Sequence, residues 1–256
     1  MEQRPERSVS VGVQLAVPLS GALALTILLW GLYSPRTIDT WILDPAVVAG
    51  LCLAGQLWYV SHRLVPSQLA RDPQDTLFGL ANTLTLVRGA LYAVVAGFVV
   101  VPPDTRLVWV PALAYGSGVV LDKLDGTVAR TVGQTTALGK RLDMTFDTFG
   151  FVAAPLVAVL WGQLPVWYLS LSVARYVYRG GLAWRRHRGR PLFDGPDSDL
   201  GRYLAGMQMV FLTAALTPAV PTAFVRSVAP VVLAPSLLVF ARDFLIVTGR
   251  LSVQEE

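Results

Sequence analysis

Long apolar runs separated by short polar segments are the main pattern along this chain. A helix needs about 20 apolar residues to cross the hydrocarbon core of a bilayer. Eight runs approach that length, and none shows the alternating polarity of a half-buried strand. We therefore predict eight transmembrane helices, over residues 11–33, 44–61, 82–101, 107–129, 141–161, 164–183, 203–217 and 227–248.

Two segments do not fit this pattern of simple spans. Residues 64–81 combine Pro66 and Pro73 with charged and apolar residues, which predicts a linker and a short helix on the membrane surface. Residues 184–202 are basic and contain Gly and Pro, which predicts a loop at the cytoplasmic face.

The composition supports a membrane protein rather than a large soluble domain. Hydrophobic residues make up 54% of the chain and charged residues only 15%, against about 25% charged residues in soluble domains. The first apolar run is longer than the roughly 7–15 residues of a signal-peptide core, and no small-residue cleavage site ends it, so we expect a retained helix. Cys52 is the only cysteine, so no disulfide can form within the chain and the redox compartment stays open.

The basic residues predict the orientation in the membrane. If both termini are cytoplasmic, the outer loops contain only Arg36, Arg106 and Arg226, and the other 18 of the 21 Lys and Arg lie at the inner side. Cytoplasmic loops are the ones enriched in Lys and Arg. We therefore predict an integral, multi-pass membrane protein with both termini and the active site at the cytoplasmic face. This topology also accounts for the net charge of +4 without a nucleic-acid partner.

Four aspartates follow helical spacing on either side of one short connection. Asp122 and Asp125 are three residues apart, and Asp143 and Asp147 are four apart. On a helix, each of these spacings places both side chains on one face. The first pair lies near the inner end of the fourth predicted span and the second near the inner start of the fifth. We expect the two helices to be antiparallel neighbours whose four carboxylates converge.

This arrangement predicts a site for divalent metal. Carboxylates at membrane depth repel one another and are costly unless they are neutralised. Oxygen ligands suit Mg²⁺, Mn²⁺ or Ca²⁺, whereas zinc is less suited because His62 and His187 are far from the cluster in sequence. Paired metals commonly serve phosphoryl transfer. The ordinary alternative is that each aspartate pairs with a nearby Lys or Arg in the headgroup region, and four at these spacings favour the metal site.

The residues around these aspartates resemble a known family. The signature of the CDP-alcohol phosphotransferases has eight fixed positions at fixed spacing, and this chain matches all of them with Asp122, Asp125, Gly126, Ala129, Arg130, Gly139, Asp143 and Asp147. The stretch from Asn82 to Arg88 also resembles the N-x-L-T-x-x-R segment that often opens the first core helix of the family. The family often has Pro before that Asn, where this chain has Ala81.

The resemblance implies an all-α integral membrane protein. A six-helix transmembrane catalytic core would occupy residues 82–248. Residues 1–64 would be an N-terminal extension with two transmembrane helices, residues 65–81 an interfacial linker, and residues 249–256 a cytoplasmic tail.

The resemblance also implies an activity. Members of this family move a substituted phosphate from a CDP-linked donor, usually the lipid CDP-diacylglycerol, to an alcohol and release CMP. They use two divalent cations, here Mg²⁺ or Mn²⁺, and are commonly homodimers. Asp122, Asp125 and Asp143 would bind one metal, and Asp122, Asp143 and Asp147 the other. Asp147 would also be the catalytic general base.

The remaining site residues follow from the same resemblance and from charge. Gly126, Ala129, Arg130 and Gly139 would form the nucleotide pocket, and Asn82 and Thr85 would border the donor, although helix packing explains Asn82 and Thr85 equally well. A phosphorylated acceptor would need cations near the inner face, and the candidates are Arg88, Arg175, Arg179 and Arg202. Attraction of these arginines to anionic lipid headgroups is the alternative. The sequence leaves open whether the acceptor is a plain or a phosphorylated alcohol.

Two other classes of function compete with the enzyme. An ion or metal transporter would distribute its acidic residues through the bilayer, whereas these gather at one face. A non-catalytic scaffold with the same fold would be expected to lack a motif aspartate, and all four are present. The sequence therefore favours the enzyme.

Overall fold

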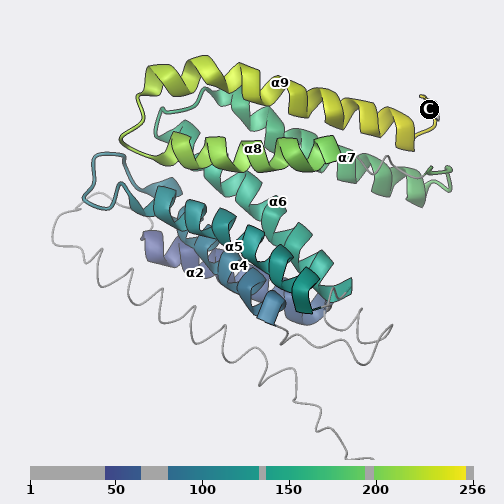
Figure 1. The fold of residues 1–256 in the computed structure, drawn as a ribbon, viewed down its shortest axis with the longest axis horizontal. Coiled ribbons are helices and arrows are strands. Elements are labelled where there is room, and N and C mark those ends of the chain that lie inside the picture. Colours follow the sequence, from purple (N-terminus) through teal and green to yellow (C-terminus); the bar gives the residue numbers. More distant parts are fainter. Residues whose placement is uncertain (1–43, 65–79, 133–136, 194–198, 252–256) are drawn as a thin grey trace, which may run out of the picture. The chain divides into compact units, whose positions relative to one another are not determined.

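The computed structural model describes residues 44–64, 80–132, 137–193 and 199–251, and this part of the chain is helical, with no strand (Figure 1). Its seven α-helices are α2 (Pro45–Tyr59), α4 (Leu80–Gly97), α5 (Val110–Val132), α6 (Ala137–Leu160), α7 (Ser170–His187), α8 (Asp199–Leu216) and α9 (Thr222–Val247). Short π- or 3₁₀-helical segments extend α2 over Val60–Leu64, follow α4 over Phe98–Val100 and precede α7 over Val166–Leu169.

The all-helical prediction is confirmed over the described residues, where helices lie at seven of the eight predicted spans. The predicted span 11–33, most of the predicted interfacial segment 64–81 and most of the tail lie outside the described residues. Three stretches are long and apolar enough to cross a bilayer, Asn82–Val100, Leu138–Leu160 and Thr222–Val247. The apolar part of α8, Leu200–Leu216, is shorter.

One boundary differs from the sequence-based prediction in an instructive way. The span predicted to end at residue 183 continues as α7 to His187, so the start of the predicted loop is helical. Arg185, Arg186 and His187 occupy the last turn of α7. Cations there interact favourably with the negative end of the helix dipole, which explains why polar residues continue the helix.

Large apolar side chains on the surface also suit a lipid environment. Val231 and Leu238 of α9 are 71% and 70% exposed, and Val173 and Val177 of α7 are similarly exposed. A water-soluble domain seldom presents so many large apolar residues on two helices. The outward-facing side chains and the long apolar helices together indicate an integral membrane protein.

The chain divides into two compact units, and each is described by itself. The first contains the described residues up to Val101 together with Ser117–Asp147, and the second contains Pro102–Gly116 together with the described residues from Thr148 onward.

Close helix packing defines the first unit. Asp44 caps α2 by accepting a hydrogen bond from the Ala46 backbone N–H at 2.7 Å, and α2 packs along α4. A buried apolar core joins these two helices to the start of α6, and its members are Leu53, Leu57, Val60, Leu86, Ala93, Leu138, Leu142 and Phe146. Gly89 permits this packing, because a Cβ atom there would lie 2.6 Å from the Phe146 ring.

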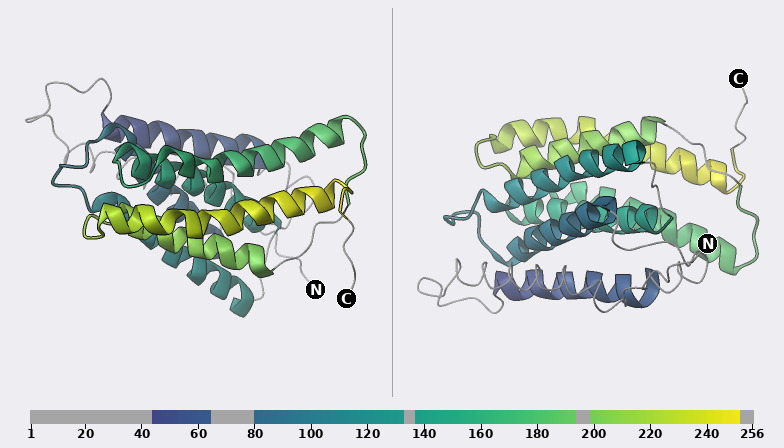
Figure 2. Two further views of the ribbon diagram at one scale, coloured as in Figure 1. Left: turned by 90° about the horizontal axis from the view of Figure 1, so that it is seen from above. Right: turned by 60° about the horizontal axis from the view of Figure 1, so that its bottom comes forward.

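Buried polar contacts hold the second unit together. In this unit α8 lies beside α9, and α7 also packs against α9 (Figure 2). Gln208 of α8 donates from Nε2 to the Val232 carbonyl at 2.9 Å and to Ser236 Oγ at 3.0 Å, both on α9. The Tyr168 hydroxyl donates to Gln208 Oε1. Interhelical hydrogen bonds of this kind fix the register of packed apolar helices.

Candidate metal centre

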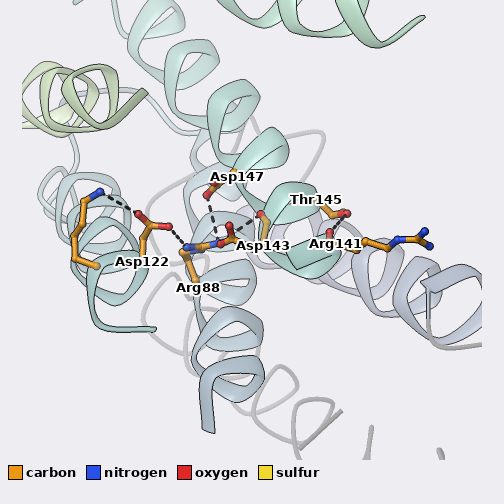
Figure 3. Close-up of polar contacts among 7 residues, drawn as sticks. Arg88, Asp122, Arg141, Asp143, Thr145 and Asp147 are labelled. Atoms are coloured by element: carbon orange, nitrogen blue, oxygen red, sulfur yellow. Dashed lines mark hydrogen bonds and ion pairs between the residues drawn. The ribbon is translucent and has the colours of Figure 1, made fainter. Parts of the chain in front are cut away.

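Three aspartates from two helices converge in the first unit. Asp122 lies on α5, and Asp143 and Asp147 lie on α6 (Figure 3). Each offers a carboxylate oxygen, and these oxygen atoms all lie within 4.8 Å of one another. The structure therefore brings together three of the four predicted metal ligands, while the side chain of Asp125 lies outside the described part.

Local packing fixes the direction of these side chains. Leu142 and Phe146, which precede Asp143 and Asp147, are buried in the apolar core of the unit at 0% and 1% exposure. Their burial sets the rotation of α6 about its axis. On α5, Gly118 lies one turn before Asp122, and a Cβ atom there would come within 2.5 Å of the Tyr92 ring. The small residue therefore lets α5 approach α4.

Arg88 lies at the centre of this carboxylate cluster. Its side chain is fully buried, and its Nη1 atom lies 2.5 Å from Asp122 Oδ1. Its Nη2 atom contacts Asp143 Oδ1 and lies 3.3 Å from Asp147 Oδ1. The sequence suggested Arg88 as an acceptor-binding cation and gave no sign of this pairing.

The charges of the cluster suit a divalent cation. Three carboxylates and one guanidinium leave a net charge of −2 among the groups in direct contact. The exposed Lys123 ammonium lies 3.6 Å from Asp122 Oδ2 at the edge. Hard oxygen donors are the ligands that Mg²⁺ and Mn²⁺ prefer. The donor atoms and the charge of this site therefore fit such an ion.

The candidate nucleotide residues are placed only in part. Asn82 and Thr85 are buried on α4, 4% and 3% exposed, and lie six and three residues before Arg88, so the three share one helix face. Gly139 lies in the first turn of α6. Gly126, Ala129 and Arg130 belong to α5, and the surroundings of their side chains lie outside the described part.

The other three candidate acceptor residues belong to the second unit. The Arg175 guanidinium carbon lies 4.4 Å from the centre of the Phe151 ring. Arg179 donates from Nη1 to Thr148 Oγ1 at 3.2 Å, and Arg202 is exposed on α8. Asp243 of α9, which sequence reasoning missed, lines the same cavity as Arg175. Its position as the one acid in a predicted span, directly after Arg242, was the available signal.

Comparisons with known proteins agree with this site. Residues 78–247 match the model of the CDP-alcohol phosphatidyltransferase family. Over 117 residues, the chain is 32% identical to proteins named "Putative cardiolipin synthase" from Mycobacterium bovis and from two strains of Mycobacterium tuberculosis. The aligned region covers 44% of this chain and 54% of each relative, so the chain matches about half the length of these curated relatives. Because the family model covers well over half of the sequence and includes every residue of the carboxylate cluster, this protein belongs to the CDP-alcohol phosphatidyltransferase family.

Proposed function

We propose that this protein transfers the phosphatidyl group of CDP-diacylglycerol to a hydroxyl group of phosphatidylglycerol and releases CMP. The observation that carries the proposal is the convergence of Asp122, Asp143 and Asp147, whose carboxylate oxygens lie within 4.8 Å of one another. Family membership supplies the reaction class, which is transfer from a CDP-alcohol donor to an alcohol acceptor.

Two divalent cations, Mg²⁺ or Mn²⁺, belong to this proposal. Asp122, Asp125 and Asp143 would hold one of them, and Asp122, Asp143 and Asp147 the other. When bound, such ions would offset the negative charge of the donor diphosphate.

The nucleotide end of the donor requires space and a phosphate ligand. We assign it to the residues that the family signature places between the aspartates, together with the start of α4. Small side chains leave room for the cytidine, and a guanidinium can pair with phosphate through two hydrogen bonds. These residues are Gly126, Ala129, Arg130, Gly139, Asn82 and Thr85.

Asp147 has the role of general base in the transfer. The acceptor hydroxyl oxygen attacks the donor phosphorus distal to cytidine and forms a new P–O bond, while the P–O bond to CMP breaks. The hydroxyl proton passes to an Asp147 carboxylate oxygen. The Asp147 side chain keeps 20% of its surface exposed, whereas Arg88 is fully buried, and this access supports the assignment.

The acceptor is proposed from the chemistry of the product. Cardiolipin contains two phosphatidyl groups on one glycerol, so a CDP-dependent transferase that forms it needs an acceptor already carrying one of them. The named relatives support this acceptor for the present chain. The phosphodiester of phosphatidylglycerol would be a ligand for cations at the inner face, and Arg175, Arg179 and Arg202 are the candidates.

The membrane arrangement is part of the same proposal. We infer a six-helix catalytic core over residues 82–248, two additional spans within residues 1–64, a linker over residues 65–81 and a cytoplasmic tail over residues 249–256. Both termini and the active site would face the cytoplasm, and the enzyme would act as a homodimer. Helices at seven of the eight predicted spans support this arrangement.

The proposal is tested with purified protein in mixed micelles. With Mn²⁺, CDP-diacylglycerol and phosphatidylglycerol, we expect stoichiometric release of CMP and formation of cardiolipin, measured by chromatography and mass spectrometry. Asp147→Asn should lower turnover by about a thousandfold or more, since a base in direct contact is lost, while Mn²⁺ binding by Asp122, Asp125 and Asp143 persists. Asp104→Asn is the matched control, because Asp104 is an exposed acid in the loop after α4.

Parallel reactions with other acceptors can refute the acceptor assignment. Serine, inositol, inositol phosphate and glycerol phosphate are offered in parallel. Preference for any of these acceptors over phosphatidylglycerol would refute the acceptor assignment. Full turnover in Asp147→Asn would remove Asp147 as the base.

A further inference from the structure

Helix α2 lies outside the part of the chain that matches the family model. The match begins at residue 78, whereas α2 covers Pro45–Tyr59 and continues over Val60–Leu64. The helix nevertheless belongs to the first compact unit, the one that contains the carboxylate cluster. Helix α2 and the carboxylate cluster therefore share one packed body.

Contacts between α2 and α4 follow the length of α2. At its start, a Cβ atom at Gly97 would lie 2.6 Å from the Pro45 carbonyl oxygen and 3.2 Å from the Ala49 Cβ atom. Further along α2, a Cβ atom at Gly89 would lie 3.0 Å from Gln56 Oε1. Residue numbers rise along α2 where they fall along α4, so the two helices are antiparallel. Small residues at both contacts let the helices approach closely.

The second of these glycines also joins α2 to α6. A Cβ atom at Gly89 would lie 2.6 Å from the Phe146 ring as well, so α2, α4 and α6 meet at this point. Gln56 is 8% exposed, and neither end of its side-chain amide forms a hydrogen bond to a described residue. Its contribution to this contact is therefore packing rather than hydrogen bonding.

Apolar side chains extend the contact along α2 and its extension. Three of them belong to the buried core that also includes residues of α4 and α6, and they are Leu53, Leu57 and Val60. On α6, Phe146 of this core directly precedes Asp147, and on α4, Gly89 directly follows Arg88. Because interiors are closely packed, removing a buried side chain shifts its neighbours. A change on the buried face of α2 is thus transmitted to charged groups of the cluster.

We propose that α2 is a positioning element of the carboxylate cluster. Its buried face, which includes Leu53 and Gln56, holds α4 and α6 at a fixed separation. That separation brings Arg88 of α4 to Asp143 and Asp147 of α6. The inference rests on the proposed function only where it takes the cluster to bind metal, and it does not depend on the identity of the acceptor.

The affinity for Mn²⁺ tests this role in the purified full-length protein. It is measured by electron paramagnetic resonance at a temperature where every variant is folded. Leu53→Ala should raise the Mn²⁺ dissociation constant about tenfold, as the loss of a contact behind the ligands does at other metal sites.

Two leucines provide matched controls. Leu51 lies on the same helix and is 66% exposed, so Leu51→Ala should change neither the Tm nor the Mn²⁺ affinity. Leu212 is 0% exposed on α8, in the second unit. Leu212→Ala should lower the Tm as Leu53→Ala does, because it also empties a buried position, and should leave the Mn²⁺ affinity unchanged.

Two substitutions of Gln56 separate shape from hydrogen bonding. Gln56→Ala removes the side-chain contact with Gly89 and should weaken Mn²⁺ binding as Leu53→Ala does. Gln56→Leu removes the amide and keeps most of the volume, a change that cores tolerate well. It should keep the wild-type Mn²⁺ dissociation constant within about twofold. A tenfold rise in Gln56→Leu would contradict a role through packing.

A distance measurement separates this inference from the proposed reaction. Spin labels are attached at Val87→Cys of α4 and Met144→Cys of α6, two exposed positions, in a Cys52→Ala background. They report the spacing of the two helices without metal. The alanine variants on the buried face of α2 should shift or broaden the distance distribution, and the two leucine controls should not.

The two readouts distinguish the possible failures. If the labels move as expected but the wild type binds no Mn²⁺, or releases no CMP with any acceptor, the proposed function fails and the positioning role stands. If the wild type turns over and Leu53→Ala matches Leu212→Ala in Mn²⁺ affinity and label distance, α2 only stabilises the fold and the inference is overturned.

Discussion

At the residue scale, Arg88 changes how the aspartate cluster is understood. A guanidinium with 0% exposure pairs with Asp122, Asp143 and Asp147, so it neutralises the same carboxylates that would hold metal. Removing one partner of a buried ion pair leaves uncompensated charge, which costs far more than an exposed pair contributes. Arg88 is therefore better explained as the counter-charge of the metal ligands than as an acceptor-binding cation.

Replacing Arg88 tests this role. In Arg88→Met the three carboxylates lose their buried cation, so without divalent metal we expect a loss of about 3–5 kcal/mol in the free energy of unfolding. Mn²⁺ should recover more stability in this variant than in wild type, because it supplies the missing charge. Arg88→Lys keeps the positive charge, so its loss of stability should be smaller than that of Arg88→Met. Some loss should remain, because an ammonium cannot bridge three carboxylates.

The measurement is thermal unfolding of the purified protein in EDTA and across a Mn²⁺ titration. Arg226→Met is the control, since Arg226 is exposed and donates to the Gly162 carbonyl at 2.7 Å. If Arg88→Met loses stability and Mn²⁺ does not restore it, the proposal that Arg88 and metal neutralise the same carboxylates would be contradicted. A raised acceptor KM with unaltered stability would instead indicate that Arg88 binds the acceptor.

At the scale of helices, glycines set the distance at which metal-bearing elements pack. Gly89 of α4 faces the Phe146 ring, and Gly118 of α5 faces the Tyr92 ring. Arg88 is adjacent to Gly89, and Asp147 is adjacent to Phe146. A change at these contacts therefore moves the charged groups as well as the apolar core.

Gly89→Ala tests the coupling between packing and the site. The added Cβ atom would lie 2.6 Å from the buried Phe146 ring, so we expect a loss of roughly 1–3 kcal/mol in stability together with reduced CMP release. Gly180→Ala on α7 is the matched control, because a Cβ atom there meets nothing within 4 Å. It should be neutral or slightly stabilising, since alanine favours helices.

A second substitution identifies the cause. Phe146→Leu removes Cε1, one of the two ring atoms that lie 2.6 Å from the new Cβ atom, and leaves a smaller side chain that can change its rotamer. The double variant should therefore regain part of the activity that Gly89→Ala loses. Additive losses in the double variant would show that the contact between Gly89 and Phe146 does not govern the site.

At the scale of the whole molecule, local periodicity predicted the helices and the facing aspartates. It could not predict contacts between residues that are far apart in the sequence. Asp143 and Asp147 are one turn apart, so helical spacing alone placed them on one face. Arg88 meets Asp122 and Asp143 across 34 and 55 residues, and no short-range pattern encodes such pairing. The cavity that Arg175 and Asp243 line likewise depends on side chains from four separate helices. The extension of α7 depends on charges at its end, which hydropathy alone treats as a break in the span.

The orientation of the whole molecule can be tested through its single cysteine, Cys52. In a Cys52→Ala background, Asp104→Cys places a thiol in the loop after α4 and Arg188→Cys places one just beyond α7. Both positions are exposed. Because cytoplasmic segments are enriched in Lys and Arg, we expect a membrane-impermeant maleimide to label the thiol at position 104 in intact cells. The thiol at position 188 should react only after the membrane is permeabilised. The reverse pattern would place the basic end of α7 outside the cell. It would then contradict the proposal that the carboxylate cluster faces the compartment where CDP-linked donors are made.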